Sequence, residues 1–465
     1  MRNIKKLQHL YRRAGFGLTP EQWLQKGNYT VQKAVNELFE EAEKTDKELE
    51  SPESQESTLQ TLSRMDEPME RENLILDKIT GVFQHSVGWL GRMAATDGSP
   101  LLEKMCLFWH GHFACETKLS GRALDYTNAL RTYALTDFRS LVLAVAQDAA
   151  MLHYLNNQQN KKGQPNENFA RELMELFTIG RGNYTEQDVK EAARAFTGWA
   201  SEPNGDFKFK RQQHDYGTKT FMGKTGNLGG EEIVDILLAR RETAEFVTQK
   251  IYRFFVNETV DVEKIQLLSK IFYESNYDIN KLMRSIFESD WFYDDENIGS
   301  NIKSPIELVV GMIRTLGIEF ESPAALVFAQ RALGQVLFRP PNVAGWAGGK
   351  AWIDNSTLLL RLNLANYLFA ASELELKVKD ELEAQERGKV TRKLSATLHW
   401  APLQKAFASA NRLDTQVGLT AFLLTPNVVL NKKLLTDSTA NAGSNDAYFQ
   451  RLTQHLMSLP EYQMC

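Results

Sequence analysis

The stretch Pro165–Gly180, which reads PNENFARELMELFTIG, decides the fold class of this 465-residue chain. When its residues are placed at intervals of 100°, they separate into two faces, as in an amphipathic helix. The apolar face holds Phe169, Leu173, Leu176 and Phe177, and the polar face holds Glu167, Asn168, Arg171, Glu172 and Glu175. Pro165 suits the first turn of a helix, and Gly180 suits the left-handed residue after a helix end. We therefore predict a helix over residues 165–180.

The polar face of this helix has two interpretations. Glu167, Arg171 and Glu175 are spaced i, i+4 and i+8, which is typical of a solvated ladder of salt bridges, and spacing alone favours this interpretation. The alternative is that the same side chains belong to a functional site. The amide-rich segment 156–164, NNQQNKKGQ, leads directly into the helix and offers both hydrogen-bond donors and acceptors. It is either the rim of a polar ligand site or a solvated turn.

The same periodicity and capping signals continue along most of the chain. Further helices are predicted at 20–24, 30–43, 58–95, 99–113, 122–135, 137–145, 148–154, 185–196, 231–239, 243–255, 262–275, 279–289, 305–315, 323–333 and 357–370. Residues 201–228 are rich in glycine and hold one predicted short strand at 207–210. The expected fold is all-α: a large multi-helix domain with long irregular loops and a small helical C-terminal extension.

Composition divides the chain and restricts its function. The predicted divisions are an N-terminal helical segment over 1–44, an acidic linker or mobile loop over 45–57, a main helical domain over 58–371 and a C-terminal helical extension over 372–465. The net charge of −5 gives no basic field for nucleic acid, and no apolar run reaches the length of a membrane span. The N-terminus lacks a signal peptide, so we expect a cytoplasmic protein, with export by another route left open.

The cysteines predict no disulfide framework. The chain has three of them, Cys106, Cys115 and Cys465, with no CxxC spacing, which suits a reducing compartment. Cys106 and Cys115 lie in an aromatic and apolar stretch, so they are expected to be packed thiols and not nucleophiles.

Three histidines are candidate metal ligands or acid–base groups. His110 and His112 lie in FWHGHF (108–113) and point about 200° apart on a regular helix, so they share a metal only if the helix ends or unwinds at Gly111. The alternative, two separate buried histidines, is somewhat favoured. His214 precedes Asp215 on the glycine-rich segment, where the pair is either a ligand or acid–base pair or a surface dipeptide.

The segment 337–357, LFRPPNVAGWAGGKAWIDNST, is a long loop with two tryptophans, Trp346 and Trp352. Loops so rich in bulky aromatic residues usually pack back on the body of a protein or line a site. Ser356 or Thr357 is expected to cap the following helix.

Several motifs together resemble one bacterial family, catalogued as domain of unknown function 1800. They are LYRRAGFG (10–17), FWHGHF, NENFARELMELFTIG, AFTGW (195–199), the His214-Asp215 pair, KSPIELVVG (303–311) and PPNVAGW (340–346), and they cover most of residues 7–370 in order. The resemblance implies an all-helical fold without an established activity, and a possible partner, encoded nearby, that resembles sulfatases and alkaline phosphatases. Many members are implied to be exported, and many have asparagine at the position of Gly111.

The resemblance also implies that the characteristic polar residues of the family form one site. In this chain they are His110, His112, Asn166, Glu167, Asn168, Arg171, Glu172, His214 and Asp215, with Asn342 and Trp346 at the border. One hypothesis is a metal-dependent or acid–base hydrolytic enzyme that acts on a saccharide or a peptide. A zinc or iron ion would be held by His110, His112, His214 and Glu172. Glu167 would be the general base and Arg171 the anion clamp.

Further roles complete this hypothesis. Asn168 and Asp215 would join the catalytic group, and the substrate would contact Asn166, Trp199, Asn342 and Trp346. The alternative is a non-catalytic helical binding or assembly protein, in which the same polar residues fix the fold and the Trp346/Trp352 loop is a docking surface. Convergent histidines favour the enzyme, and the Glu/Arg ladder favours the scaffold. The sequence leaves open whether this protein is an enzyme.

Overall fold

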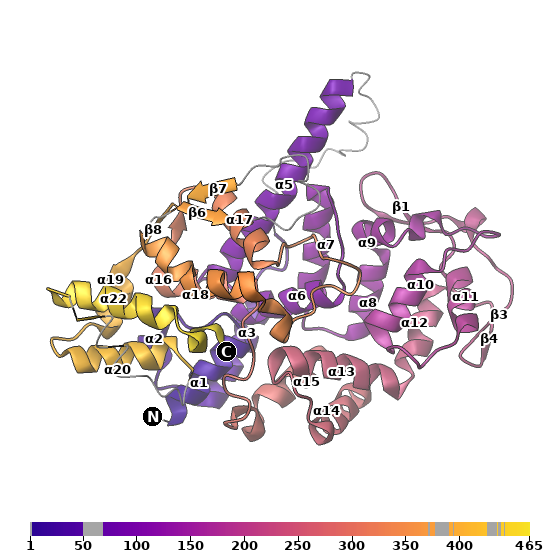
Figure 1. The fold of residues 1–465 in the computed structure, drawn as a ribbon. Helices are drawn as coiled ribbons and strands as arrows, with labels where there is room; N and C mark the ends of the chain where they lie inside the picture. Colours follow the sequence, from indigo (N-terminus) through magenta and orange to yellow (C-terminus); the bar gives the residue numbers. More distant parts are fainter. Residues whose placement is uncertain are drawn as a thin grey trace.

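The fold is built almost entirely from helices, as Figure 1 shows, and the only sheets among the described residues are two-stranded. The computed structural model describes residues 2–49, 68–370, 373–376, 390–393, 395–425, 435, 439–440 and 442–465. The predicted all-α class is therefore confirmed. Most of the predicted linker over 45–57 and the first ten residues of the helix predicted over 58–95 lie outside the described residues.

The helices of the first half follow the capping signals closely. They are α1 (Arg2–Arg13), α2 (Pro20–Lys26), α3 (Val31–Lys44), α5 (Pro68–Ala94), α6 (Pro100–His112), α7 (Ser120–Tyr133), α8 (Phe138–Gln147), α9 (Ala149–Tyr154), η1 (Asn157–Gln159), α10 (Asn168–Glu172), η2 (Leu173–Thr178) and α11 (Glu186–Ala195). Thr19 and Thr185 each form a capping box at the start of a predicted helix, and Ser99 caps α6.

The second half continues in the same way. Its helices are η3 (Arg211–Gln213), α12 (Gly230–Leu238), α13 (Arg241–Phe255), α14 (Val262–Glu274), α15 (Ile279–Phe287), η4 (Asp290–Tyr293), α16 (Pro305–Leu316), α17 (Pro323–Leu333), η5 (Gly349–Trp352), α18 (Asn355–Ala370), α19 (Trp400–Phe407), α20 (Arg412–Leu423), α22 (Asn445–Met457) and η7 (Pro460–Gln463). The strands are β1 (Trp199–Ser201), β2 (Phe207–Phe209), β3 (Lys219–Phe221), β4 (Lys224–Gly226), β5 (Glu319–Phe320), β6 (Glu373–Leu376), β7 (Val390–Lys393) and β8 (Ala396–Thr397). The short strand predicted near Phe207 is confirmed as β2.

The four small sheets are all antiparallel ladders of two strands. β1 pairs with β2, so that Trp199 lies opposite Phe209, and β3 pairs with β4. β5 pairs with β8, and β6 pairs with β7. The first two ladders stiffen the glycine-rich segment over 201–228 and hold it against α11 and the rest of the helical body (Figure 1).

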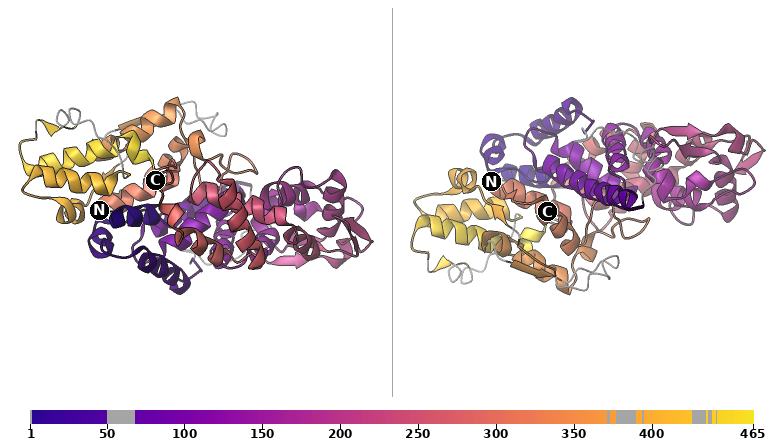
Figure 2. Two further views of the ribbon diagram at one scale, coloured as in Figure 1. Left: turned by 90° about the horizontal axis from the view of Figure 1, so that it is seen from below. Right: turned by 90° about the horizontal axis from the view of Figure 1, so that it is seen from above.

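The segments near the two ends of the chain pack together. The side-chain Nε2 atom of Gln8 in α1 donates to the carbonyl oxygen of Phe422 in α20 at 2.6 Å, and Nη2 of Arg12 donates to the same oxygen at 2.8 Å. In both views of Figure 2 these segments lie in one half of an elongated molecule, and the region of α11 and β1–β4 forms the opposite end. The division into the four predicted regions stays a prediction.

The central stretch departs from the regular helix predicted over 165–180. The helix begins at Asn168, so Pro165 precedes it, and after Glu172 the backbone continues as a π-helix, η2. In this register the amides of Ile179 and Gly180 both donate to the carbonyl oxygen of Met174. The predicted apolar residues Phe169, Leu173 and Phe177 are buried, as is Met174. Gly180 ends the helix with φ of +79°, which confirms the predicted left-handed residue.

The cap of α18 also differs from the prediction. The helix begins at Asn355, and its cap is the carboxylate of Asp354, which accepts hydrogen bonds from the backbone amides of Ser356 and Thr357 at 2.9 and 2.8 Å. Ser356 and Thr357 are therefore residues of the first turn and not the cap.

Candidate functional site

His110 and His112 lie on the last turn of α6 and face different parts of the core. The Nε2 atom of His110 accepts a hydrogen bond from the backbone amide of Phe338 at 3.3 Å. The Nε2 atom of His112 lies 3.0 Å from the carbonyl oxygen of Phe177. Both side chains are buried. Because α6 stays helical through His112, the two rings point apart, as the separate-histidine alternative predicted.

Burial keeps both imidazoles neutral. It lowers the pKa of His110 to about 3, with the nearby His85 lowering it further. Burial also lowers the pKa of His112 to about 3, and Lys250 adds to this effect. The two histidines are packed among aromatic rings, and within the described part of the chain the Nδ1 atom of each has no hydrogen-bond partner.

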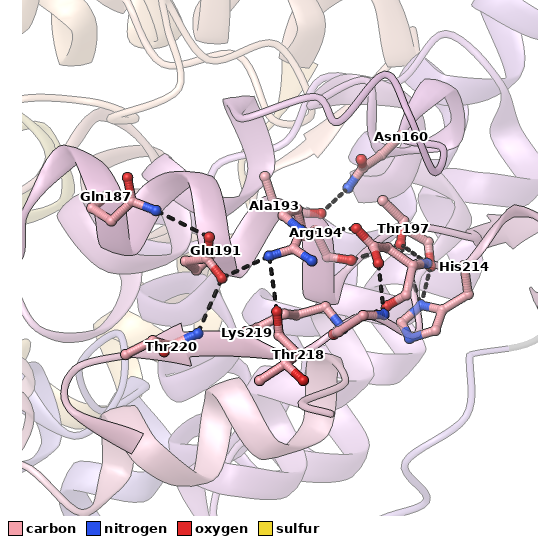
Figure 3. A network of polar contacts seen from close by, with 12 residues as sticks. Asn160, Gln187, Glu191, Ala193, Arg194, Thr197, His214, Thr218, Lys219 and Thr220 are labelled. Atoms are coloured by element: carbon pink, nitrogen blue, oxygen red, sulfur yellow. Dashed lines mark hydrogen bonds and ion pairs between the residues drawn. The ribbon is translucent and has the colours of Figure 1, made fainter. Parts of the chain in front are cut away.

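His214 and Asp215 belong to a polar network that fastens the glycine-rich segment to α11, shown in Figure 3. The Nδ1 atom of His214 lies 2.8 Å from the carbonyl oxygen of Thr197. The carboxylate of Asp215 accepts a hydrogen bond from Nε of Arg194 at 2.8 Å, and this bond lowers the pKa of Asp215 to about 2. Glu191 accepts from Nη1 of Arg194 at 2.9 Å. These contacts hold the glycine-rich segment against α11, which is a structural role.

The polar face of the central helix forms the solvated ladder in part. Arg171 pairs with Glu167 at 3.1 Å and with both carboxylate oxygens of Glu186 on α11, at 2.7 and 2.8 Å. Glu175 does not continue the ladder, because the π-helix turns it toward Tyr184, whose hydroxyl donates to it at 2.7 Å, and toward Arg181. The predicted ion pair between Glu167 and Arg171 is thus confirmed, and the predicted continuation of the ladder to Glu175 is wrong.

Glu172 is the one carboxylate of this helix that accepts no hydrogen bond from the described residues. Burial, followed by the charge of Glu175, raises the pKa of its side chain. The charges of Arg171 and Arg181 act in the opposite direction. Glu172 therefore lies between a like charge and two cations, without a direct partner among them.

The predicted catalytic group is not brought together. Arg171 pairs with Glu167 and with the first residue of α11, Glu186, whereas Asp215 contacts Arg194 near the other end of the same helix. Eight residues of α-helix separate Glu186 from Arg194, which corresponds to about 12 Å. A small reacting group cannot touch both sets at once.

The predicted metal set is also not assembled. Within the described residues, no three His, Cys, Asp or Glu side chains come close enough to hold a metal ion. His110 contacts Phe338, His112 contacts Phe177, and His214 contacts Thr197, so the three imidazoles occupy separate environments. The described residues therefore do not bring these three imidazoles together with Glu172 around one zinc or iron ion, because each ring is held by a different segment.

Three of the predicted substrate contacts serve the backbone or the core. The side-chain oxygen of Asn166 accepts from the amide of Asn168 at 3.0 Å, and the side-chain amide of Asn168 donates to the carbonyl oxygen of Leu155 at 3.2 Å. Trp199 is buried against Phe196. The side-chain oxygen of Asn342 accepts from the amide of Ala344 at 2.9 Å within its own turn.

Trp346 is the exception, because it lines a cavity. The cavity has a volume of about 470 Å³ and lies between the end of α17, the loop over 341–354 and the start of α18. Its apolar lining includes Leu333, Pro341, Trp346, Trp352 and Leu360, and its polar lining consists of Arg331, Asp354, Ser356 and Thr357. Trp352, named with Trp346 as a docking residue in the alternative hypothesis, thus shares this cavity with it.

The loop that carries Trp346 is held rigidly by residues of the sequence motifs. Phe338 has φ of +62°, an unfavourable value for a bulky residue, and its amide is fixed by the hydrogen bond to His110. Gly345 packs so closely that a Cβ atom there would lie 2.5 Å from the carbonyl oxygen of Gly111. The FWHGHF and PPNVAGW motifs therefore meet, and His110 positions the loop.

Gly111 itself leaves room for a side chain. A Cβ atom built there meets no atom within 4 Å, so the absence of an asparagine at this position leaves no packing defect. Sequence reasoning missed Arg331 and Asp354 as lining residues of the cavity. The DxST signal of a capped helix at 354–357 was the available clue to Asp354, whereas nothing local marks Arg331, which lies on α17.

No helix in the described part of the chain is both long and apolar enough to cross a membrane. Comparison with curated proteins and with solved structures gives no significant match. A family model does match, over residues 9–464, and its description is protein of unknown function (DUF1800). Since the match covers nearly the whole chain, this protein belongs to the DUF1800 family.

Proposed function

We propose that this protein is a helical binding protein whose cavity at Trp346 and Trp352 takes a saccharide. One observation carries the proposal: a strained loop, fixed by His110 and Gly345, places two indole rings in the wall of a cavity that also contains Arg331, Asp354, Ser356 and Thr357. Strained backbone that is held in place by surrounding contacts is concentrated at ligand sites.

The chemistry of the lining fits this ligand class. The volume of about 470 Å³ lies in the usual range for small-molecule sites, which is roughly 300–1,000 Å³. Trp346 and Trp352 are both partly exposed, so each can offer indole surface to the apolar C–H face of a sugar ring, although one face of Trp346 stacks on His110. The polar lining consists of a carboxylate, two hydroxyls and a guanidinium, which are groups that sugar hydroxyls pair with; in this structure the Ser356 hydroxyl donates to Asp354 at 2.7 Å.

A peptide ligand has less support at this cavity. Peptides commonly bind by adding a strand to an exposed sheet edge. The lining of the cavity comes from helices and an irregular loop, and none of the described strands contributes to it. The hydrolytic hypothesis is also less supported, because Glu167 and Asp215 are each engaged by an arginine, and these two arginines contact opposite ends of α11 or belong to them.

The experiment is titration of the purified protein with neutral hexasaccharides of glucose and of N-acetylglucosamine, followed by calorimetry and tryptophan fluorescence. We expect saturable binding that is lost in Trp352→Ala and weakened in Trp346→Ala. Trp291→Ala is the matched control, since Trp291 is partly buried against Tyr252 and lies outside the cavity. Equal binding by Trp352→Ala and wild type would reject the cavity as the site.

A parallel titration with unstructured peptides separates the two ligand classes. Binding of peptides but not of saccharides, with the same dependence on Trp352, would replace the saccharide by a peptide. The sulfatase-like or phosphatase-like partner implied by the family resemblance stays a prediction. The proposed binding of a saccharide in the cavity does not require that partner.

A further inference from the structure

Two motifs that the proposed function does not use meet at a second, smaller cavity. LYRRAGFG (10–17) supplies Arg12, Gly15, Phe16 and Gly17, and KSPIELVVG (303–311) supplies Lys303, Glu307 and Gly311. The cavity has a volume of about 40 Å³ and is closed by Lys104 of α6 and by Tyr462 and Cys465. None of its lining residues is shared with the cavity at Trp346.

The charges around this cavity do not balance. Its lining contains three cations, Arg12, Lys104 and Lys303, and a single carboxylate, Glu307, among the described residues. Lys104 and Glu307 form an ion pair, and the second carboxylate oxygen of Glu307 accepts from the amide of Ser304 at 2.6 Å. The one side-chain carboxylate is therefore fully used by Lys104 and by the helix cap, and neither Arg12 nor Lys303 has a side-chain carboxylate as a direct partner among the described residues.

Two further cations contact residues that line the cavity. Nη1 of Arg13 lies 3.0 Å from Sγ of Cys465, and Nη2 of Arg361 donates to the carbonyl oxygen of Lys303 at 2.5 Å. Both guanidinium groups are buried, with exposed fractions of 1%. Nη1 of Arg361 has no hydrogen-bond partner among the described residues. Since a guanidinium stays protonated, these groups add permanent positive charge.

Lys303 and Arg12 have donors directed at neutral groups only. The Nζ atom of Lys303 donates to the carbonyl oxygen of Tyr462 at 2.6 Å, which leaves two N–H groups available. Nη2 of Arg12 donates to the carbonyl oxygens of Phe422 and Leu423 at 2.8 and 2.9 Å. Burial, followed by the charge of Arg12, lowers the pKa of Lys303 to about 7. An anion in the cavity would stabilise the charged form of Lys303 and would raise its pKa.

We propose that this cavity binds a small oxyanion, of the size of phosphate or sulfate, between Arg12 and Lys303. A cavity needs roughly 10–15 Å³ to hold one water molecule, so a volume of about 40 Å³ restricts the ligand to a single small anion. Buried charges in proteins are ordinarily paired, and the described side chains provide no second carboxylate here. The Arg12 side chain is only partly buried, so this wall of the cavity lies near the protein surface.

The test is calorimetry and thermal unfolding of the full chain with inorganic phosphate, in a buffer free of other oxyanions and at constant ionic strength. We expect a one-to-one complex and a saturable rise in melting temperature that sodium chloride does not reproduce. Lys303→Met should abolish this response and should raise the melting temperature without phosphate, because it removes a buried charge that is close to the charge of Arg12. Arg139→Gln is the control, since it removes an exposed cation far from the cavity.

The outcomes are distinct from those of the saccharide experiment, because the two cavities share no residue. If phosphate and sulfate fail to bind wild type, or bind Lys303→Met as tightly as wild type, the proposal is overturned. If chloride raised the melting temperature as much as phosphate does, the stabilisation would come from general screening of charge, and the proposal would also be overturned. Should Lys303→Met fail to fold, Arg12→Lys replaces it, and loss of the guanidinium fork should weaken phosphate binding about tenfold.

Discussion

The indole ring of Trp346 stacks on the imidazole of His110, with ring centroids 5.5 Å apart and planes inclined by 20°. This contact joins the end of α6 to the loop before α18. It gives His110 a role that differs from metal binding, because the ring supports the Trp346 face while its Nε2 atom holds the amide of Phe338.

Gly345→Ala should displace the Trp346 loop. The position has φ of +75°, and the added Cβ would lie 2.5 Å from the carbonyl oxygen of Gly111. Gly182→Ala is the matched control, because its φ is +90° but no atom lies within 4 Å of the added Cβ. We expect the control to lose about 1 kcal/mol of unfolding free energy and Gly345→Ala to lose about 2–4 kcal/mol. Urea denaturation measures both.

The same variant should weaken saccharide binding in the Trp346 cavity, since the indole ring moves with the loop. If Gly345→Ala and Gly182→Ala lose the same stability, the contact with Gly111 is not a packing constraint, and the rigid-loop argument fails.

The protein should lose stability in acid because of its buried histidines. The folded pKa values of His110 and His112 are about 3, below the unfolded value of about 6.5. The unfolded chain therefore takes up protons first, so the stability is complete above pH 6.5 and is lost as the pH falls from 6.5 toward 3. At pH 5 each histidine should cost about 2 kcal/mol. Urea denaturation between pH 7.5 and 5 measures the slope.

His110→Gln isolates one of these contributions. Its side-chain oxygen can still accept from the amide of Phe338, so the loop contact is kept while the titrating group is removed. We expect the slope of stability against pH to fall by about one proton. His399→Gln, which removes an exposed histidine, is the control. An unchanged slope in His110→Gln would contradict the neutral buried imidazole.

Glu103→Gln should be strongly destabilising. Glu103 on α6 forms a buried ion pair with Arg131 and accepts from Nε1 of Trp89 at 2.8 Å. Removal of the carboxylate charge leaves the guanidinium buried without a counter-ion, which costs about 3–5 kcal/mol. Asp235→Asn breaks a solvent-exposed pair with Arg139 and should cost less than about 1 kcal/mol. Similar losses in the two variants would refute the difference in burial.

Glu167→Gln should change the stability of the protein very little. Its side chain is partly exposed, and Arg171 keeps its two bonds to Glu186, so the expected loss of unfolding free energy is below about 1 kcal/mol. Saccharide binding should not change. If the variant kept its stability but abolished the function of the protein in cells, a catalytic role of Glu167 would regain support. A large loss of stability would instead show that the ladder fixes the fold.

The fold class was readable from the sequence because helix formation depends on local patterns. Apolar spacing and the caps at Thr19, Ser99, Thr185 and Ser304 are satisfied within a few residues of chain, so they predicted most helices to within a turn. The π-helix at Leu173–Thr178 was not readable, because its extra residue per turn is stabilised by packing and not by a local signal.

The sequence by itself thus determined the helices, their caps and the presence of chemically rich loops. Only the tertiary structure decided which of these segments meet. It separated His110, His112 and His214, placed Arg171 and Asp215 at opposite ends of α11, and brought Trp346 against His110. The physical reason is that contacts between distant segments depend on how the helical faces pack together. The residues next to a side chain in the sequence do not determine which distant segment will pack against it.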